Sequence, residues 1–267
     1  MIKRILIIVI VLALSIVKTS NSFASTPIDA ATKEAFQDFY IGIGLSGIAF
    51  FNDNPSWKHI LNSPDKNDVL GGSFDGLESG IHLSVMTNLN ESSSLLLPIS
   101  FEYDWLTAAE QMYQTSRTKL QVKHSIDIQK LGIGLQWQFL TFPFKDVKGY
   151  MEADLKVIFI NNQEYRYVIS ELETDGTITS NLGPYNPKET AVRFGAEYKL
   201  GFRGQLTKNF FINSFLGIEL LNLLGRNDDR GELLTPWGSL KQMQERSESK
   251  EQYVPNLHFV LMIEYKL

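Results

Sequence analysis

The fold of this chain is decided by its C-terminal stretch, Phe259-Val260-Leu261-Met262-Ile263-Glu264-Tyr265-Lys266-Leu267. Apolar or aromatic residues occupy every odd position, and both charged residues, Glu264 and Lys266, fall on even positions. Side chains of a β-strand point alternately to opposite faces, so this period of two predicts a strand with one wholly apolar face. Such a face needs an apolar environment on its side of the strand.

Seven earlier segments show the same alternation. They are Phe39–Phe51, Gly76–Met86, Leu95–Leu106, Lys119–Phe139, Lys148–Ile160, Val192–Gly204 and Phe210–Leu223, and the last strand is Pro255–Leu267. Their connections alternate between long and short, the long ones including Asn52–Phe74, Asn161–Thr190 and Leu224–Val254. This arrangement predicts an all-β fold, an eight-stranded antiparallel up-and-down β-barrel.

Alternation alone leaves two barrels open, because a soluble eight-stranded barrel keeps its apolar face inside. Glycine decides between them. Glycines lie on the polar faces, at positions 42, 44, 80, 132, 134, 195, 201 and 217. A narrow, filled lumen needs small residues, whereas glycine would only weaken a solvated exterior strand. We therefore expect a transmembrane barrel with a polar lumen, short periplasmic turns, long extracellular loops, and girdle aromatics such as Trp105 and Trp137.

The N-terminal region predicts export. Basic Lys3 and Arg4 precede an apolar run that is too short to span a bilayer, and small residues follow it, which is typical of a secretory signal peptide over residues 1–24. We expect a periplasmic lead-in at 25–38 and the barrel domain at 39–267. The chain has no cysteine, so a disulfide framework is excluded. A formal charge of −5 makes nucleic acid an improbable partner.

The C-terminal strand resembles the assembly signal of bacterial outer-membrane barrels, with Tyr265 as its last aromatic residue. Almost the whole chain after residue 24 resembles the small eight-stranded outer-membrane protein family, which includes outer-membrane protein X and the transmembrane domain of outer-membrane protein A. The resemblance implies the outer membrane of a Gram-negative bacterium, contact with its lipids and lipopolysaccharide, recognition of the last strand by the barrel-assembly machinery, and a monomer. It implies roles from envelope integrity to surface attachment.

The inward faces carry many charged residues. The expected lumen charge network comprises Glu152, Asp154, Lys156, Arg193, Glu197, Lys199, Arg203 and Glu219. Other inward ionisable residues include Glu102, Asp104, Lys130, His82 and His258. Opposite charges lie on adjacent strands, as buried charges require. An eight-stranded lumen is about filled by side chains, so we expect a structural network, with an ion pathway as the alternative.

The long loops are the expected location of any specificity. Two of them place a tryptophan after an N-cap residue and a proline, and we predict a short helix over 54–61 and another over 235–243. Trp57 and Trp237 are candidate loop-binding residues, in loops that flank the seam between the first and last strands.

The sequence gives weaker support to three other functions: an enzyme, a metal or cofactor site, and a conduit. A lipid A-modifying enzyme is the least favoured alternative. The adjacent pair His124-Ser125 would face opposite sides of a strand, so it predicts no nucleophile and base, and the chain does not match the lipid A deacylase or palmitoyltransferase patterns. We therefore expect no enzyme. No ligand spacing for a metal stands out, and no cofactor is expected. The alternative function is a narrow conduit or binder for small hydrophobic molecules, similar to the outer-membrane protein W group, lined by Ile158, Phe215, Val260 and Met262.

Overall fold

The structure is a computed structural model. It describes residues 38–52, 54, 56–62, 68–90, 92, 94–114, 116–143, 146–173, 175–184, 190–224, 226–227, 233–234, 250–251 and 253–267. The expected signal peptide at 1–24 and nearly all of the lead-in lie outside these residues.

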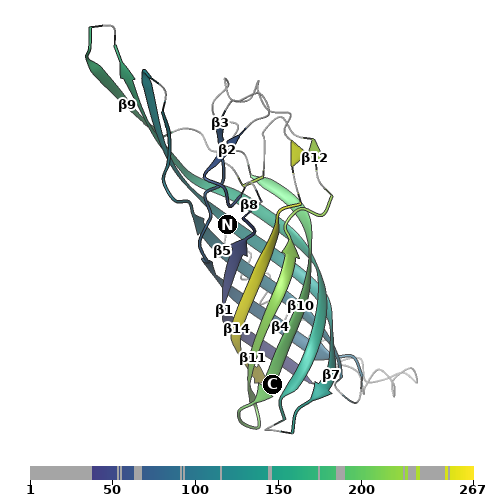
Figure 1. The fold of residues 1–267 in the computed structure, drawn as a ribbon. Helices are drawn as coiled ribbons and strands as arrows, with labels where there is room; N and C mark the ends of the chain where they lie inside the picture. The colour runs from purple at the N-terminus through teal and green to yellow at the C-terminus, as the bar shows by residue number, and fades with distance from the viewer. Residues whose placement is uncertain are drawn as a thin grey trace.

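Eight long strands close into one barrel (Figure 1). They are β1 (Phe39–Phe50), β4 (Glu78–Asn88), β5 (Leu95–Thr107), β7 (Thr118–Thr141), β8 (Lys148–Leu172), β10 (Ala191–Gln205), β11 (Phe210–Leu220) and β14 (Pro255–Lys266). Each pairs antiparallel with the next, and β14 returns to pair with β1 from Tyr40 opposite Lys266 to Phe50 opposite Asn256. The predicted eight-stranded antiparallel barrel is confirmed, and the last strand closes it.

The apolar faces point outward. Leu45 is 69% exposed and Leu155 is 62% exposed, whereas the neighbouring inward residues Ser46 and Asp154 are buried. The glycines lie on the inward face, and Gly80 shows why: a Cβ there would collide with the Asp104 carboxylate and the Ser46 hydroxyl. The lumen is thus polar and too crowded at that point for any larger residue.

The two ends of the barrel differ. At one end, here called the turn end, short connections at 89–94, 142–147 and 206–209 lie beside the start of β1 and the end of β14. At the other, the loop end, the long connections carry additional short strands. These are β2 (Ile60–Asn62), β3 (Asp68–Leu70), β6 (Gln111–Gln114), β9 (Ile178–Pro184), β12 (Arg226–Asn227) and β13 (Lys250–Glu251). The predicted alternation of long and short connections is confirmed.

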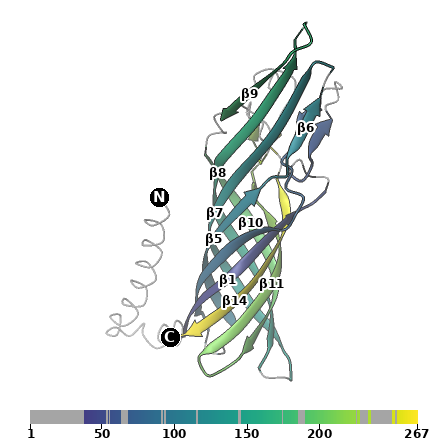
Figure 2. The ribbon, with the colours of Figure 1, turned by 90° about the vertical axis from the view of Figure 1, so that its left-hand side faces the viewer.

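Strands β7 and β8 continue well past the barrel ring at the loop end (Figure 2). Their pairing shifts at Ser125/Ile126, a bulge of the kind found at barrel rims, and resumes to Thr118 opposite Glu171. Strand β6 pairs with β7 and β9 pairs with β8, which builds a projecting four-stranded sheet. Most of the stretch Asn161–Thr190, expected to be a loop, is therefore a β-hairpin.

The predicted helix over 54–61 is wrong. The Asn54 carbonyl accepts hydrogen bonds from the N–H groups of Trp57 and Lys58 at 3.0 and 3.3 Å, which makes a single turn. The chain then enters β2, because the His59 carbonyl accepts the Gly71 N–H at 2.9 Å and draws the segment into a hairpin with β3. The second predicted helix, over 235–243, lies outside the described residues.

Aromatic pairs mark both rims of the apolar belt. Tyr103 and Trp105 lie 6.0 Å apart, centroid to centroid, toward the loop end. Trp137 and Phe139, 5.7 Å apart, lie toward the turn end. These positions agree with the girdles expected where a membrane meets water. None of the segments described here is a helix with the length and apolarity needed to cross a membrane.

Exchanging Leu155 for Arg at the middle of the belt should lower the free energy of unfolding by ~2–4 kcal/mol, because a charge there would sit in hydrocarbon. The matched control is Leu206→Arg, at a residue that is 59% exposed in a turn outside the belt, where the cost should be ~0–1 kcal/mol. Reversible urea unfolding in lipid vesicles measures both. Equal costs would contradict the placement of the belt.

Candidate functional site

An apolar cluster, here called the mouth cluster, lies at the loop end of the lumen. It joins inward residues of the barrel strands to loop residues: Ile48, Phe50, Phe74, Leu106, Ala108, Ile126, Ile128, Ile158, Ile160, Ala191, Leu221, Leu233, Leu234 and Val254. Ile126, Ile128, Ile158 and Ile160 have no exposed surface. Burial of this kind is worth ~1.5–3 kcal/mol for each large side chain, so hydrophobic packing stabilises the loop end of the barrel.

At the turn end, the inward side chains are held by stacking and ion pairing of an arginine. The Arg203 guanidinium lies between two rings, 4.0 Å from the centroid of Tyr40 and 4.2 Å from that of Phe211. Its Nε donates to Glu264 at 2.6 Å, and Asn213 donates to the other oxygen of that carboxylate at 2.5 Å. Met86 and Leu96 pack against the same rings. The charge is thus stacked, paired and buried.

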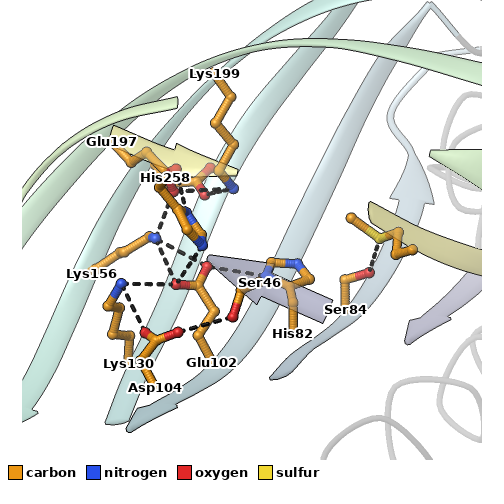
Figure 3. Close-up of polar contacts among 12 residues, drawn as sticks. Ser46, His82, Ser84, Glu102, Asp104, Lys130, Lys156, Glu197, Lys199 and His258 are labelled. Atoms are coloured by element: carbon orange, nitrogen blue, oxygen red, sulfur yellow. Dashed lines mark hydrogen bonds and ion pairs between the residues drawn. The ribbon is translucent and has the colours of Figure 1, made fainter. Parts of the chain in front are cut away.

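Lys156 is the centre of the charged network between these two ends (Figure 3). Its Nζ lies 3.0 Å from both oxygens of Glu102, 2.9 Å from Glu219 and 2.5 Å from Glu197. These carboxylates come from β5, β11 and β10, so one ammonium on β8 joins four strands. Each of the four side chains is 0% exposed.

Two further lysines extend the network. Lys130 contacts Glu219 at 2.7 Å, Asp104 at 3.1 Å and Glu102 at 3.3 Å. Lys199 contacts Glu152 at 2.7 Å, and it also pairs with Asp154. Ser46 donates to Asp104 at 2.9 Å and ties β1 into the same set. Because each lysine is shared among several carboxylates, these buried charges form one unit.

Two buried histidines complete this set. His258 Nδ1 donates to Glu197 at 2.7 Å, and His82 Nδ1 donates to Glu102 at 3.1 Å, since an ionised carboxylate can only accept. Each imidazole also makes a T-shaped contact with the ring of Phe215, with ring centroids 5.6 Å apart for His258 and 5.7 Å apart for His82. The histidines therefore link the charges to the mid-lumen apolar cluster of Tyr150, Phe215, Val260 and Met262.

Acidic groups outnumber lysines in this network. The carboxylates are Glu102, Asp104, Glu152, Asp154, Glu197 and Glu219, and the lysines are Lys130, Lys156 and Lys199. A buried excess of negative charge calls for protons or a cation. Glu102, Glu197 and His258 offer ligand atoms within 4.8 Å of one another. The Lys156 ammonium already contacts both of these carboxylates, so the space a metal would need is filled.

The structure brings together most of the residues named from the sequence. Glu152, Asp154, Lys156, Glu197, Lys199 and Glu219 lie in the central network, whereas Arg203 lies apart at the turn end. Arg193 is buried nearer the mouth and donates to the Val192 carbonyl at 2.8 Å. Glu102, Asp104, Lys130 and His258 were expected to face inward but were not assigned to the network. Their signal is barrel closure, which places β5 across the lumen from β11.

Trp57 packs against the mouth cluster and is partly buried, so it covers the barrel mouth. Trp237 lies outside the described residues, and its role as a loop-binding residue stays a prediction. The four expected conduit residues are all buried inside: Ile158 belongs to the mouth cluster, and Phe215, Val260 and Met262 belong to the mid-lumen cluster. These four residues therefore belong to two separate buried clusters and do not form one connected lining.

Removing the central ammonium should be costly. Lys156→Met leaves three buried carboxylates short of a partner and should lower the free energy of unfolding by ~3–5 kcal/mol. The control is Lys266→Met, which breaks the 2.8 Å pair with Asp38, whose side chains are 33% and 27% exposed, and should cost ~0–1 kcal/mol. Urea unfolding in vesicles compares them, and similar losses would mean that the network is not a cooperative unit.

No protein-family model matches the chain, and no curated protein matches it. Solved structures do. Neisserial surface protein A is 10% identical, over 86% of this chain and 97% of that one, with a TM-score of 0.41. The outer membrane protein OprG of Pseudomonas aeruginosa is 11% identical, over 87% and 97%, with a TM-score of 0.44.

The attachment invasion locus protein Ail of Yersinia pestis is 10% identical over 87% of this chain and 99% of that one, with a TM-score of 0.38. Identities this low assign no activity, and the barrel is established by the closed ring of eight strands in this chain itself. The chain is similar to small outer-membrane β-barrel proteins, in agreement with the resemblance expected from its sequence.

Proposed function

We propose that the protein resides in the bacterial outer membrane after removal of its signal peptide, as a monomer with the turn end in the periplasm. The belt supports this placement: Ile43 and Leu155 are 65% and 62% exposed, and aromatic pairs bound the belt on both sides. Exposed apolar surface that surrounds a whole barrel suits lipid and not water.

The lumen is proposed to be structural. A solute would have to displace the Arg203 stack at one end, the lysine network in the middle and the mouth cluster at the other end. Each layer is held by a different interaction, namely cation–π stacking, ion pairing and apolar burial. This filling disfavours the conduit for small hydrophobic molecules, because its expected lining residues are themselves core residues.

The loop end is proposed to carry the function, as a surface-binding or envelope-structural face. The observation that carries this proposal is the continuation of β7 and β8 beyond the barrel into a four-stranded sheet with β6 and β9. A projecting, hydrogen-bonded sheet holds its shape, so it offers a partner a fixed surface at low entropic cost. Trp57 at the mouth belongs to the same face.

Lipopolysaccharide is the proposed neighbour just above the belt. Lys119 and Lys123 lie on the outward side of β7, beyond the girdle residue Trp105, and Lys123 is exposed. Two ammonium groups at that height suit the phosphates of an anionic lipid. The barrel-assembly machinery is proposed to recognise β14, the strand that closes the ring.

The localisation prediction is that the protein will fractionate with the outer membrane and will migrate differently on a gel before and after heating. A closed barrel resists the detergent until it is heated, which is the reason for the shift. Recovery of the protein in the soluble periplasm without detergent would contradict the placement.

The functional prediction separates loops from lumen. In a loop variant, Asn-Gly replaces residues 167–183 and joins Arg166 to Pro184, which are register partners across the hairpin. We expect this variant to fold and to lose attachment of cells to matrix-coated plates, or survival of cells in dodecyl sulfate. Liposomes carrying the wild-type barrel should not swell in arabinose.

The control for this experiment is Lys208→Ala in an exposed turn at the opposite end, which should keep both phenotypes. Arabinose-driven swelling would show an open lumen and support the conduit. If the loop variant keeps both phenotypes while the folded Lys156→Met variant loses one, the function belongs to the lumen and the proposal is wrong.

A further inference from the structure

Three side chains in the connection between β1 and β4 form a hydrogen-bonded line. Ser73 Oγ lies 3.1 Å from His59 Nδ1, and His59 Nε2 lies 2.9 Å from Asp75 Oδ2. One neutral tautomer satisfies both contacts, because a proton on Nε2 is donated to the carboxylate and leaves Nδ1 free to accept from the serine hydroxyl. A hydroxyl, an imidazole and a carboxylate in this order are the parts of an activated nucleophile.

The loop backbone holds Ser73 in a fixed and unusual conformation. Its φ is +59°, in the left-handed region that serine rarely adopts. The Ser73 N–H donates to the Lys58 carbonyl at 3.0 Å, and its own carbonyl accepts the Ala109 N–H at 3.0 Å. Residues kept in such regions by surrounding bonds are concentrated at functional sites. The nucleophile position is thus braced from two different segments.

The neighbouring residues hold the backbone of His59 in place. The His59 carbonyl accepts the Gly71 N–H at 2.9 Å, and the side-chain amide of Gln111 bonds both the N–H and the carbonyl of Gly71, at 3.2 and 2.5 Å. A Cβ at Gly72 would collide with the backbone of Ser56, so only glycine fits at position 72. These contacts keep the backbone segments that carry His59 and Ser73 next to each other.

We propose that Ser73, His59 and Asp75 form a serine-hydrolase triad that cleaves carboxylic esters at the loop end of the barrel. This activity goes beyond the proposed surface role. It also departs from the expectation of no enzyme, which rests on the adjacent pair His124-Ser125 and on the lack of a match to lipid A-modifying enzymes. The acting residues are distant in sequence from that pair and are separated from one another by the β2–β3 hairpin.

The reaction follows from the contacts. Ser73 Oγ attacks the ester carbonyl and gives its proton to His59 Nδ1; the C–O bond to the alcohol breaks, and His59 protonates the departing alcohol. Water then attacks the acyl-serine, passes a proton to His59 and releases the carboxylic acid, with the proton returned to Ser73. Asp75 is a positioning residue that holds the tautomer and stabilises the transient imidazolium.

Exposure limits the substrate to one that approaches from outside the cell. The side chains of His59 and Asp75 are 44% and 43% exposed. Ser73 has no exposed surface in this conformation, so an ester reaches its hydroxyl oxygen only when the residues packed around Ser73 shift. Phe74, the next residue, is part of the mouth cluster, and Trp57 packs on that cluster. A small ester with an apolar acyl group fits this setting.

The test uses the folded full-length barrel in detergent micelles and a fluorescent fluorophosphonate. Attack by Ser73 would form an oxygen–phosphorus bond and release fluoride, and peptide mass analysis should place the label on Ser73. His59→Gln should slow labelling by about 100-fold or more, as expected for loss of a general base. Hydrolysis of p-nitrophenyl acetate should fall in parallel.

Asp75→Asn should lower kcat for this ester while leaving KM nearly unchanged, and Asp75→Glu should restore part of kcat; a merely structural carboxylate would show no such split. The control is Ser92→Ala, at an exposed serine whose hydroxyl contacts Ser94 and not a histidine, and it should label fully. Heat-shifted gel mobility verifies folding of every variant.

Two results would overturn the triad. One is no labelling of the folded wild-type barrel above the level of Ser73→Ala, in which case the line is only a brace of the loop. The other is labelling of Ser73 that does not depend on His59, which would mean that the serine is accessible but not activated. The loop-hairpin experiment above tests the surface role separately, because its variant leaves this connection intact.

Discussion

The pairing of β1 with β14 is the constraint on which the rest of the structure depends. A sheet with two open edges leaves rows of backbone N–H and carbonyl groups without partners, and a hydrocarbon environment offers them none. Closure removes both edges in a single step. It also encloses a narrow interior, and every inward side chain must then fit that interior or be glycine, as Gly80 is beside Asp104.

The interior resolves this crowding with charge in the middle and apolar side chains at the mouth. Lysines are shared among carboxylates from several strands, so each of these buried lysines has more than one partner. The carboxylates of this network outnumber its lysines. The two buried histidines are the other groups of the network that can carry positive charge. Because these side chains occupy the lumen, any binding surface is expected at the loop end, where the chain builds its projecting sheet.

Much of the barrel could be predicted from the sequence, because the period of two is local and is repeated in each strand. Leu155 outward and Lys156 inward follow from counting alone. The partners of Lys156 do not, since Glu102 and Glu219 lie on strands that are not its neighbours, and local spacing says nothing of distances across a lumen. The sequence predicts a loop after Asn161, whereas β8 extends to Leu172 because it pairs with β7 on one side and β9 on the other. The contacts among His59, Ser73 and Asp75 depend on a hairpin between them, which the sequence does not predict. The cap and proline at 54–55 predict a helix, but the same residues also begin a single turn, as they do here.

The position of Lys156 also bears on how the barrel comes apart. Its ammonium holds carboxylates of β5, β10 and β11 from its place on β8, so bonds across the lumen join strands from both halves of the ring. Peeling a single hairpin away from the wall would expose unpaired charge before it released much backbone. Partial opening is therefore the least favourable route, and the strands are bound into one cooperative unit whose lifetime is set by the loss of the entire network at once.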